Sequence, residues 1–272
     1  MPGVGARLGA FTMVLAGTFG TAYALGEQLP GHSHTGYTHN HSLSLAGPLV
    51  AGYTYADYVL RIDQMTPATA TAPGSITFHL EAPDNTTVTA WTPVHEADLH
   101  AMVLRPDLSG FRHLHPTIAA DGTWQMDVPA PGPWQFTFEA TPAERTDPVI
   151  VGARVDDGEP YDATTLPAPA DIVTVTTLHG DLTITREDFN FWVEDATGTT
   201  PDGLEPYLGA AAHLVAMRQG DLAYLHLHPV GEVPGVFQFQ GVLEPGATYR
   251  LFLQFGYLGE VISVAFTVEV PS

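Results

Sequence analysis

Six of the thirteen histidines in this chain occur in two copies of one pattern. The first copy, the first triad, contains His100, His113 and His115, and the second triad contains His213, His226 and His228. Each copy has the form H-x12-H-x-H-P, and the second lies 113 positions after the first (213 − 100 = 113). Neutral imidazoles bind zinc, copper and nickel, and three of them around one ion is a common arrangement. The repeat predicts one three-histidine metal site in each half of the chain.

The spacing places each triad on a β-hairpin. Residues i and i+2 of a strand share a face, so His113 and His115 lie together. If Arg105 pairs with Gly110, His100 lies opposite His115, with His113 on the diagonal. Directly opposed Cβ atoms lie about 4.5–5.5 Å apart and diagonal ones about 7–8 Å, which lets three rings converge on one ion. The same register is predicted for the second triad.

The chain contains no cysteine. Thiolate zinc sites, iron–sulfur clusters and the His2Cys site of blue-copper proteins are therefore excluded. Three imidazoles suit copper(II), zinc or nickel and also hold copper(I), so we expect a copper ion, with zinc as the alternative. Met102, on the face of His100, and Met217, on the matching strand, are candidate thioether ligands, although a methionine in a strand more often fills the core.

Other residues near the repeat have weaker claims. His79 is a candidate fourth ligand in the first half only, because Trp192 stands at its matching position. His95 is matched by Leu208 and so lies outside the repeated set, and His179 precedes Gly180-Asp181, which indicates a turn.

The pattern also repeats an arginine. Arg105 recurs as Arg218 at the same offset, and these arginines lie close to Asp107 and Asp221 respectively. A salt bridge that braces each hairpin is the expected role, and binding of an anion is the alternative.

The elements that carry the triads are predicted to be short strands separated by Gly, Pro and Asp turns. Seven are expected in each half, at 58–62, 76–81, 99–105, 110–115, 124–128, 134–139 and 149–155, and at 172–177, 189–194, 212–218, 223–228, 236–240, 249–255 and 262–268. The 113-residue offset extends to Phe78-His-Leu-Glu81, which matches Phe191-Trp-Val-Glu194, so one domain was duplicated. The predicted fold is all-β, with two tandem immunoglobulin-like antiparallel β-sandwiches at 51–156 and 171–272 joined by a linker at 157–170.

The N-terminus indicates export. Arg7 precedes an uncharged, mostly apolar run, and Ala22-Tyr23-Ala24 fits the small-x-small pattern of a cleavage site. Residues 1–25 are therefore predicted to be a signal peptide, with a transmembrane anchor as the alternative. Residues 26–50 carry His32, His34, His39 and His41 and are predicted to be a flexible tether, either a loose metal collector or a plain polar linker.

The net charge is −21, with nine arginines, no lysine and 30 carboxylates. Such a surface repels phosphate backbones, so nucleic acid is not an expected partner. The expected partners are a metal ion and a second envelope protein that handles metal, and contact with the membrane is expected only through the N-terminal segment.

The segment from Glu205 to Pro229, which contains HLVAMRQGDLAYLHLHP, and the segment from Leu99 to Pro116 resemble a family of exported bacterial proteins with HLVAxRxxDLAYLHxHP-type motifs. The resemblance covers about residues 50–270, together with the hydrophobic N-terminus and the tether. The family is loosely associated with heavy-metal or copper handling. The resemblance therefore implies export, two β-domains and a secreted, periplasmic or membrane-anchored location.

These observations favour an extracytoplasmic protein that sequesters or delivers copper and is not an enzyme. The affinity is expected to fall as the pH drops through about 6.5, where free imidazole is protonated. Two alternatives remain open. One is a metal-dependent hydrolase with an open three-histidine zinc site, assisted by Glu96. The other is an envelope interaction module that binds no metal and buries these histidines in its core.

Overall fold

β-strands are the regular elements of the part of the chain that the structure describes. The computed structural model describes residues 51–231 and 233–272, and these belong to one compact unit. The predicted export segment at 1–25 and the histidine-rich tether at 26–50 lie outside the described residues. Within those described ranges, no helix is long and apolar enough to cross a membrane.

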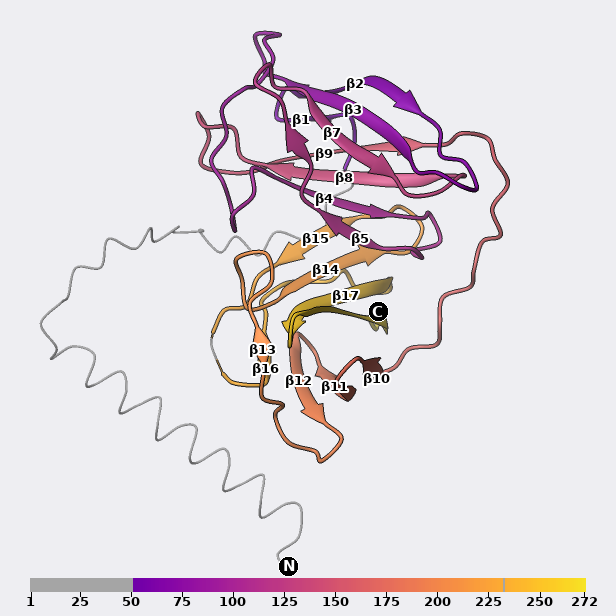
Figure 1. The fold of residues 1–272 in the computed structure, drawn as a ribbon, viewed down its shortest axis with the longest axis vertical. Coiled ribbons are helices and arrows are strands. Elements are labelled where there is room, and N and C mark those ends of the chain that lie inside the picture. Colours follow the sequence, from indigo (N-terminus) through magenta and orange to yellow (C-terminus); the bar gives the residue numbers. More distant parts are fainter. Residues whose placement is uncertain (1–50, 232) are drawn as a thin grey trace, which may run out of the picture. The chain divides into compact units, whose positions relative to one another are not determined.

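The first half of the described chain folds into two antiparallel sheets (Figure 1). One sheet has the order β1 (Thr54–Tyr55), β2 (Tyr58–Thr66), β3 (Gly74–Glu81), β7 (Trp124–Val128) and β6 (Thr117–Ile118). The other has the order β5 (Arg112–Leu114), β4 (Leu99–Leu104), β8 (Trp134–Ala140) and β9 (Val149–Val155). Apart from the two-residue β1, which pairs with β2, these orders correspond to the A-B-E-D and C′-C-F-G sheets of an immunoglobulin-like sandwich.

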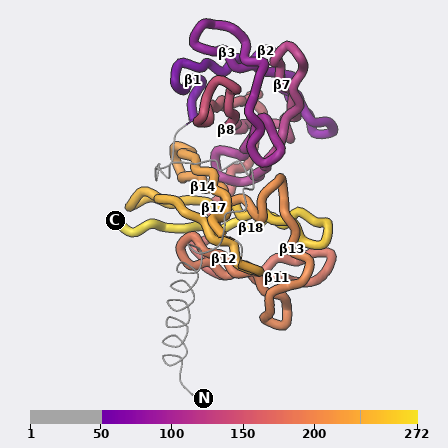
Figure 2. Tube along the Cα trace, turned by 90° about the vertical axis from the view of Figure 1, so that its left-hand side faces the viewer, coloured from indigo at the N-terminus to yellow at the C-terminus, as the bar shows by residue number. Residues whose placement is uncertain are grey.

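The second half repeats this arrangement. One sheet contains β10 (Ile172–Thr177), β11 (Gly180–Glu187), β12 (Asn190–Asp195) and β16 (Val236–Gln238). The other contains β13 (Leu204–Glu205), β17 (Thr248–Tyr257), β14 (His213–Arg218), β15 (Tyr224–Leu227) and β18 (Glu260–Glu269), which pairs with β17. Figure 2 shows β14 beside β17 in the tube view. The predicted fold class, two tandem antiparallel β-sandwiches, is confirmed.

Strand β11 is not predicted by the sequence pattern. It follows β10 through a two-residue turn at Leu178 and His179, so the turn predicted at His179 is confirmed. Its C-terminal half carries Arg186 and Glu187, and it places only Leu182 and Ile184 in the core. Two apolar residues in eight give too weak an alternation to mark a strand.

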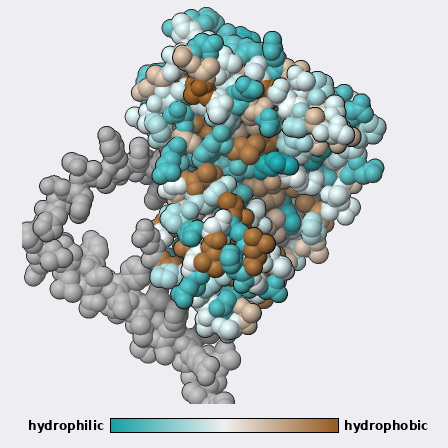
Figure 3. Space-filling model, viewed as in Figure 1, coloured by the Kyte–Doolittle hydropathy of each residue, from teal (hydrophilic) through white to brown (hydrophobic). Residues whose placement is uncertain are grey.

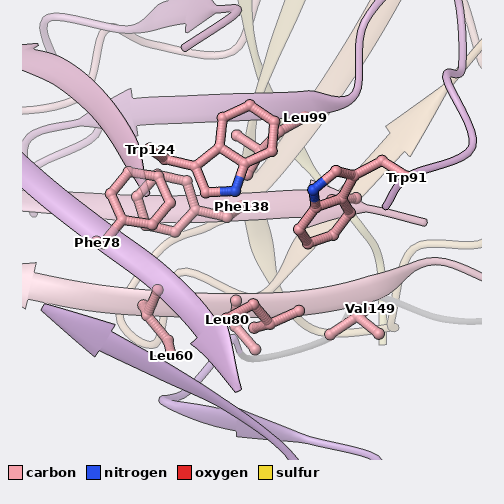
Figure 4. A pocket seen from close by; sticks show the side chains of 10 residues that line it. Leu60, Phe78, Leu80, Trp91, Leu99, Trp124, Phe138 and Val149 are labelled. Atoms are coloured by element: carbon pink, nitrogen blue, oxygen red, sulfur yellow. The ribbon is translucent and has the colours of Figure 1, made fainter. Parts of the chain in front are cut away.

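Each sandwich has its own apolar core, built from alternate residues of facing strands. In β3 the residues Ile76, Phe78 and Leu80 are buried, and those between them are only half-buried. The ring of Phe78 stacks on that of Phe138 from the opposite sheet at 4.2 Å between centroids. Figure 4 shows both rings with Trp91 and Trp124 around a small cavity in this core. Burial of each such side chain contributes about 1.5–3 kcal/mol, so the cores hold the sheets together.

Strand β4 is buried on both of its faces, as is almost all of β14. One face of each strand enters its own sandwich, and the other packs against the partner sandwich. The resulting interdomain cluster contains Met102, Leu104, Leu108, Val215, Met217, Tyr224 and Phe252. Phe111 adds a ring that stacks on Phe252 at 4.1 Å. By contrast, the surface seen in Figure 3 is largely hydrophilic, with hydrophobic residues in separate patches.

The two repeated arginines differ in their contacts. Arg218 forms the predicted salt bridge with Asp221 at 2.6 Å, and it also pairs with Glu244. The prediction for Arg105 is wrong: its guanidinium donates to the carbonyls of Pro131 and Pro133 and lies 4.0 Å from the centre of the Trp134 ring. The carbonyls of the Pro-Gly-Pro turn are closer acceptors for Arg105 than the carboxylate of Asp107.

The linker predicted at 157–170 contains no strand and is held against the first sandwich. Asp107 accepts hydrogen bonds from the backbone NH of Thr164 at 2.7 Å and from its hydroxyl at 3.1 Å. The guanidinium of Arg105 lies 5.0 Å from the ring centre of Tyr161, and Leu166 packs against the interdomain cluster. The linker is therefore a docked segment.

Candidate metal centre

The two triads lie on hairpins with the predicted register. In the first hairpin Ala101 pairs with Leu114 and Met102 with His113, which is the register that places His100 opposite His115. In the second, Val215 pairs with His226, the equivalent register after the 113-residue offset. Because side chains alternate along a strand, both triads lie on the outer faces of their sheets, the faces that form the interdomain cluster.

A tight turn before each hairpin fixes one histidine of each triad. The turns run from Val94 to Ala97 and from Tyr207 to Ala210, and their central residues, His95, Glu96, Leu208 and Gly209, all have positive φ, from 45° to 75°. This conformation is that of a type I′ turn. The carbonyl of Val94 lies 3.0 Å from His100 Nε2, and the carbonyl of Tyr207 lies 2.9 Å from His213 Nε2. A carbonyl only accepts, so both Nε2 atoms carry the ring hydrogen and both Nδ1 atoms carry a lone pair.

These lone pairs face other histidines. His100 Nδ1 lies 3.0 Å from His113 Nε2 and 3.3 Å from His115 Nε2. His213 Nδ1 lies 3.2 Å from His226 Nε2. His228 completes the second triad, with its ring centre 4.9 Å from that of His213. Each triad is therefore brought together by its own hairpin.

The two triads also meet each other. The ring centre of His226 lies 5.4 Å from that of His100 and 5.3 Å from that of His113, and the centres of His113 and His213 are 5.1 Å apart. Two groups of histidines could hold a metal ion, each with ligand atoms within 4.8 Å of one another: His100 with His113 and His226, and His213 with His226 and His228.

The structure thus differs from the expectation of one separate site per domain. The second group is the predicted second triad, whereas the first group takes His226 from the second domain in place of His115. The physical reason is that the outer faces of the two hairpin sheets are packed against each other, which places all six rings in one cluster. We call this set the histidine cluster.

Burial keeps the rings of the histidine cluster neutral. Loss of solvation lowers the pKa of His213 to about 4, although the carbonyl of Tyr207 opposes the shift. The same effect, reinforced by the neighbouring rings, lowers the pKa values of His113, His226 and His228 far below the usual range. The neutral form of an imidazole has a free nitrogen lone pair, and this is the form that binds a metal ion.

One carboxylate touches the histidine cluster from outside the motif. Glu139 Oε2 accepts from the Tyr224 hydroxyl at 2.5 Å and lies 3.1 Å from His226 Nδ1. Burial, with Glu139 beside it, raises the pKa of Tyr224, so the hydroxyl remains a donor. Because the carboxylate accepts, His226 Nδ1 carries the hydrogen and Nε2 carries the lone pair. Glu139 lies on β8 of the first sandwich and therefore orients a histidine of the second.

Two residues near the histidine cluster are not predicted by the repeat. The ring of His95 packs against that of His228 at 3.9 Å between centres, tilted by 35°, and its Nδ1 lies 3.3 Å from the carbonyl of Gly209. Glu139 is the other. Neither recurs in the second copy: Leu208 stands at the position that matches His95, and Gln254 pairs with His213 as Glu139 pairs with His100. One sequence feature points to Glu139: it is a charged residue near the end of a strand, 134–140, whose other residues are mostly buried.

The weaker candidates lie elsewhere. His79 is on β3, in the other sheet of the first sandwich, where its Nδ1 contacts Asp63 at 2.9 Å, so it is not a fourth ligand. Glu96 is exposed in its turn. Met102 and Met217 are fully buried in the apolar interdomain cluster, in agreement with the core role.

Comparisons with known proteins add little on function. A family model described as a domain of unknown function (DUF8832) matches residues 168–272, which contain the second sandwich. No curated protein matches the chain. Among solved structures, a segment of two fibronectin type-III domains from chicken tenascin is 10% identical, covers 78% of this chain and 97% of that chain, and has a TM-score of 0.20. The assignment of two tandem sandwiches follows from the strand orders of the sheets.

Proposed function

We propose that this protein is an extracytoplasmic copper-binding protein that sequesters or delivers the metal, with zinc as the alternative ion. The histidine cluster is the binding centre, and it lies across the interface of the two sandwiches. The tether at 26–50 collects metal loosely. The resemblance to exported proteins associated with heavy-metal handling supports the location and the cargo.

The observation that carries the proposal is a conflict between two lone pairs. His213 donates through Nε2 to the carbonyl of Tyr207, and His226 donates through Nδ1 to Glu139. Their remaining nitrogens, both acceptors in the neutral rings, face each other at 3.2 Å. Two buried acceptors at this distance repel unless a cation lies between them. A proton is disfavoured there because burial lowers the pKa of both rings, so a metal ion is the cation that fits.

The spacing of the nitrogens agrees with this assignment. At about 2.0–2.1 Å per bond, two nitrogens on a tetrahedral ion lie about 3.3–3.4 Å apart. The distances from His100 Nδ1 to His113 and His115 are 3.0 and 3.3 Å. His228 Nε2 and His113 Nδ1 are buried without a hydrogen-bond partner. A metal ion supplies the missing partner of His228 Nε2.

The test is the metal content and stoichiometry of the full-length protein, purified without a histidine tag. We expect about two equivalents of copper or zinc in tight sites, and these sites persist when the four tether histidines are replaced by alanine. His226→Ala, which removes the ring common to both groups, lowers the tight stoichiometry to one or less. The matched control His79→Ala, in the other sheet, leaves it unchanged. Absence of tight binding in the unaltered chain contradicts the proposal.

A further inference from the structure

The two metal-binding groups cannot both be complete at the same time. His226 belongs to both of them. Its Nδ1 is engaged by Glu139, so only the single Nε2 lone pair is available, and a neutral imidazole nitrogen binds one ion. A second ion must therefore complete its site without His226. His115 is placed to do so, because its Nε2 lies 3.3 Å from His100 Nδ1.

The duplicated fold shows what distinguishes the two resulting sites. Glu139 pairs with His100 across neighbouring strands, and Gln254 pairs with His213 in the same way. Glu139 and Gln254 are therefore structural counterparts. Across the interface Glu139 contacts His226, whose counterpart is His113. Gln254 is expected to face His113 by the same symmetry, with a neutral amide in place of the carboxylate.

Two buried atoms without a hydrogen-bond partner agree with the pairing of Gln254 with His113. These atoms are His113 Nδ1 and Gln254 Oε1. When His113 binds a metal ion through Nε2, its Nδ1 carries the hydrogen and becomes a donor, for which Gln254 Oε1 is a suitable acceptor. A second difference reinforces the first: Tyr224, which donates to Glu139, is matched by Phe111, which has no hydroxyl. One site has a hydrogen-bonded carboxylate behind its ligand, and the other has an amide.

We propose that Glu139 is a positioning residue that makes the second triad the tighter site, so that divalent cations fill the centre in a fixed order. The first ion binds His213, His226 and His228, and the second binds His100, His113 and His115. A carboxylate behind a ligating histidine fixes the ring orientation and increases its basicity, and loss of such a partner typically weakens binding about 10–100-fold. The proposal rests on the metal-binding function proposed above.

The experiment is a calorimetric titration of the metal-free, full-length protein with Zn²⁺ and a competing chelator. All variants carry alanine at the four tether histidines, so that only the histidine cluster is titrated. The parent shows two steps, with the first at least about tenfold tighter than the second. Glu139→Gln weakens the first step about 10–100-fold and leaves the second unchanged. The matched variant Gln254→Glu strengthens the second step and leaves the first unchanged.

The double variant E139Q/Q254E separates positioning from a merely structural role. It restores two well-separated steps in reversed order. His228→Ala removes the tighter step in the parent, whereas His115→Ala removes it in the double variant. If E139Q and Q254E leave both stepwise affinities unchanged, in proteins whose thermal unfolding is also unchanged, the positioning role of Glu139 is refuted. The metal-binding function then still stands. If the parent binds neither Zn²⁺ nor Cu²⁺, the proposed function fails with it.

Discussion

The buried histidines predict that the metal-free protein loses stability steeply in mild acid. Burial lowers the pKa of His213 to about 4, whereas in the unfolded chain the pKa of histidine is about 6.5. Between these values the unfolded state binds a proton that the folded state does not. The stabilisation is therefore complete above pH 6.5 and is lost as the pH falls toward 4.

The size of the loss in unfolding free energy follows from the pKa of histidine in the unfolded chain. At pH 5.5 the proton taken up by His213 in the unfolded chain favours unfolding by RT ln(1 + 10), about 1.4 kcal/mol. Three further rings, His113, His226 and His228, have pKa values that burial lowers far below the usual range, so each adds a similar amount. The sum of about 5–6 kcal/mol is comparable to the whole stability of many domains.

Urea denaturation of the chelator-treated protein at pH 7.5 and pH 5.5 measures this difference. His228→Asn removes one titrating ring, so we expect the difference between the two pH values to shrink by about 1.4 kcal/mol. Equal stability of the parent protein at the two pH values refutes the reasoning, because it means that these rings are protonated in the folded state or are not buried.

Three further predictions concern the metal, the interface and the linker. The affinity of the folded protein for Zn²⁺ stays nearly constant from pH 7.5 to about 5 and falls only toward pH 4. The reason is that burial moves the protonation of His213 below the range of free imidazole. A loss of affinity with its midpoint near pH 6.5, measured by chelator competition, contradicts this. Phe252→Ala removes the ring that stacks on Phe111 in the interdomain cluster, so it lowers the free energy of unfolding by about 3–5 kcal/mol. The control Val261→Ala changes a side chain that is 52% exposed and alters the free energy of unfolding by less than about 0.5 kcal/mol. Equal effects of the two variants in urea denaturation count against a packed interface. Arg105→Ala removes the guanidinium beside Tyr161, so limited proteolysis cleaves the linker faster, and an unchanged cleavage rate shows that the linker is held by other contacts.

The pH prediction revises the expectation from the sequence. From spacing alone the affinity is expected to change near pH 6.5, the value for a solvated imidazole. Spacing gives no information about solvation, because the same H-x12-H-x-H-P pattern can lie on an exposed hairpin or a buried one. Packing of one sheet face on another removes water from the rings, which lowers the pH at which they are protonated and lose their affinity for metal.

The long core strands other than β11, the hairpin register and the composition of each triad follow from local rules. Short apolar runs bounded by turn residues mark β4 and β14, and the Pro106–Ser109 turn sets the pairing of Met102 with His113. Polar β11 escapes those rules because it buries only Leu182 and Ile184.

The sequence by itself determined a duplicated all-β chain and two sets of imidazoles, because strand periodicity and repeat offset are properties of neighbouring residues. Tertiary structure alone decided that these sets form one histidine cluster across the domain interface. It also decided that Glu139 of the first sandwich contacts His226 of the second, and that His95 packs against His228. These contacts join residues about 90 to 130 positions apart (226 − 139 = 87; 228 − 95 = 133). They exist because the apolar outer faces of two sheets exclude water by packing together, which no local pattern encodes.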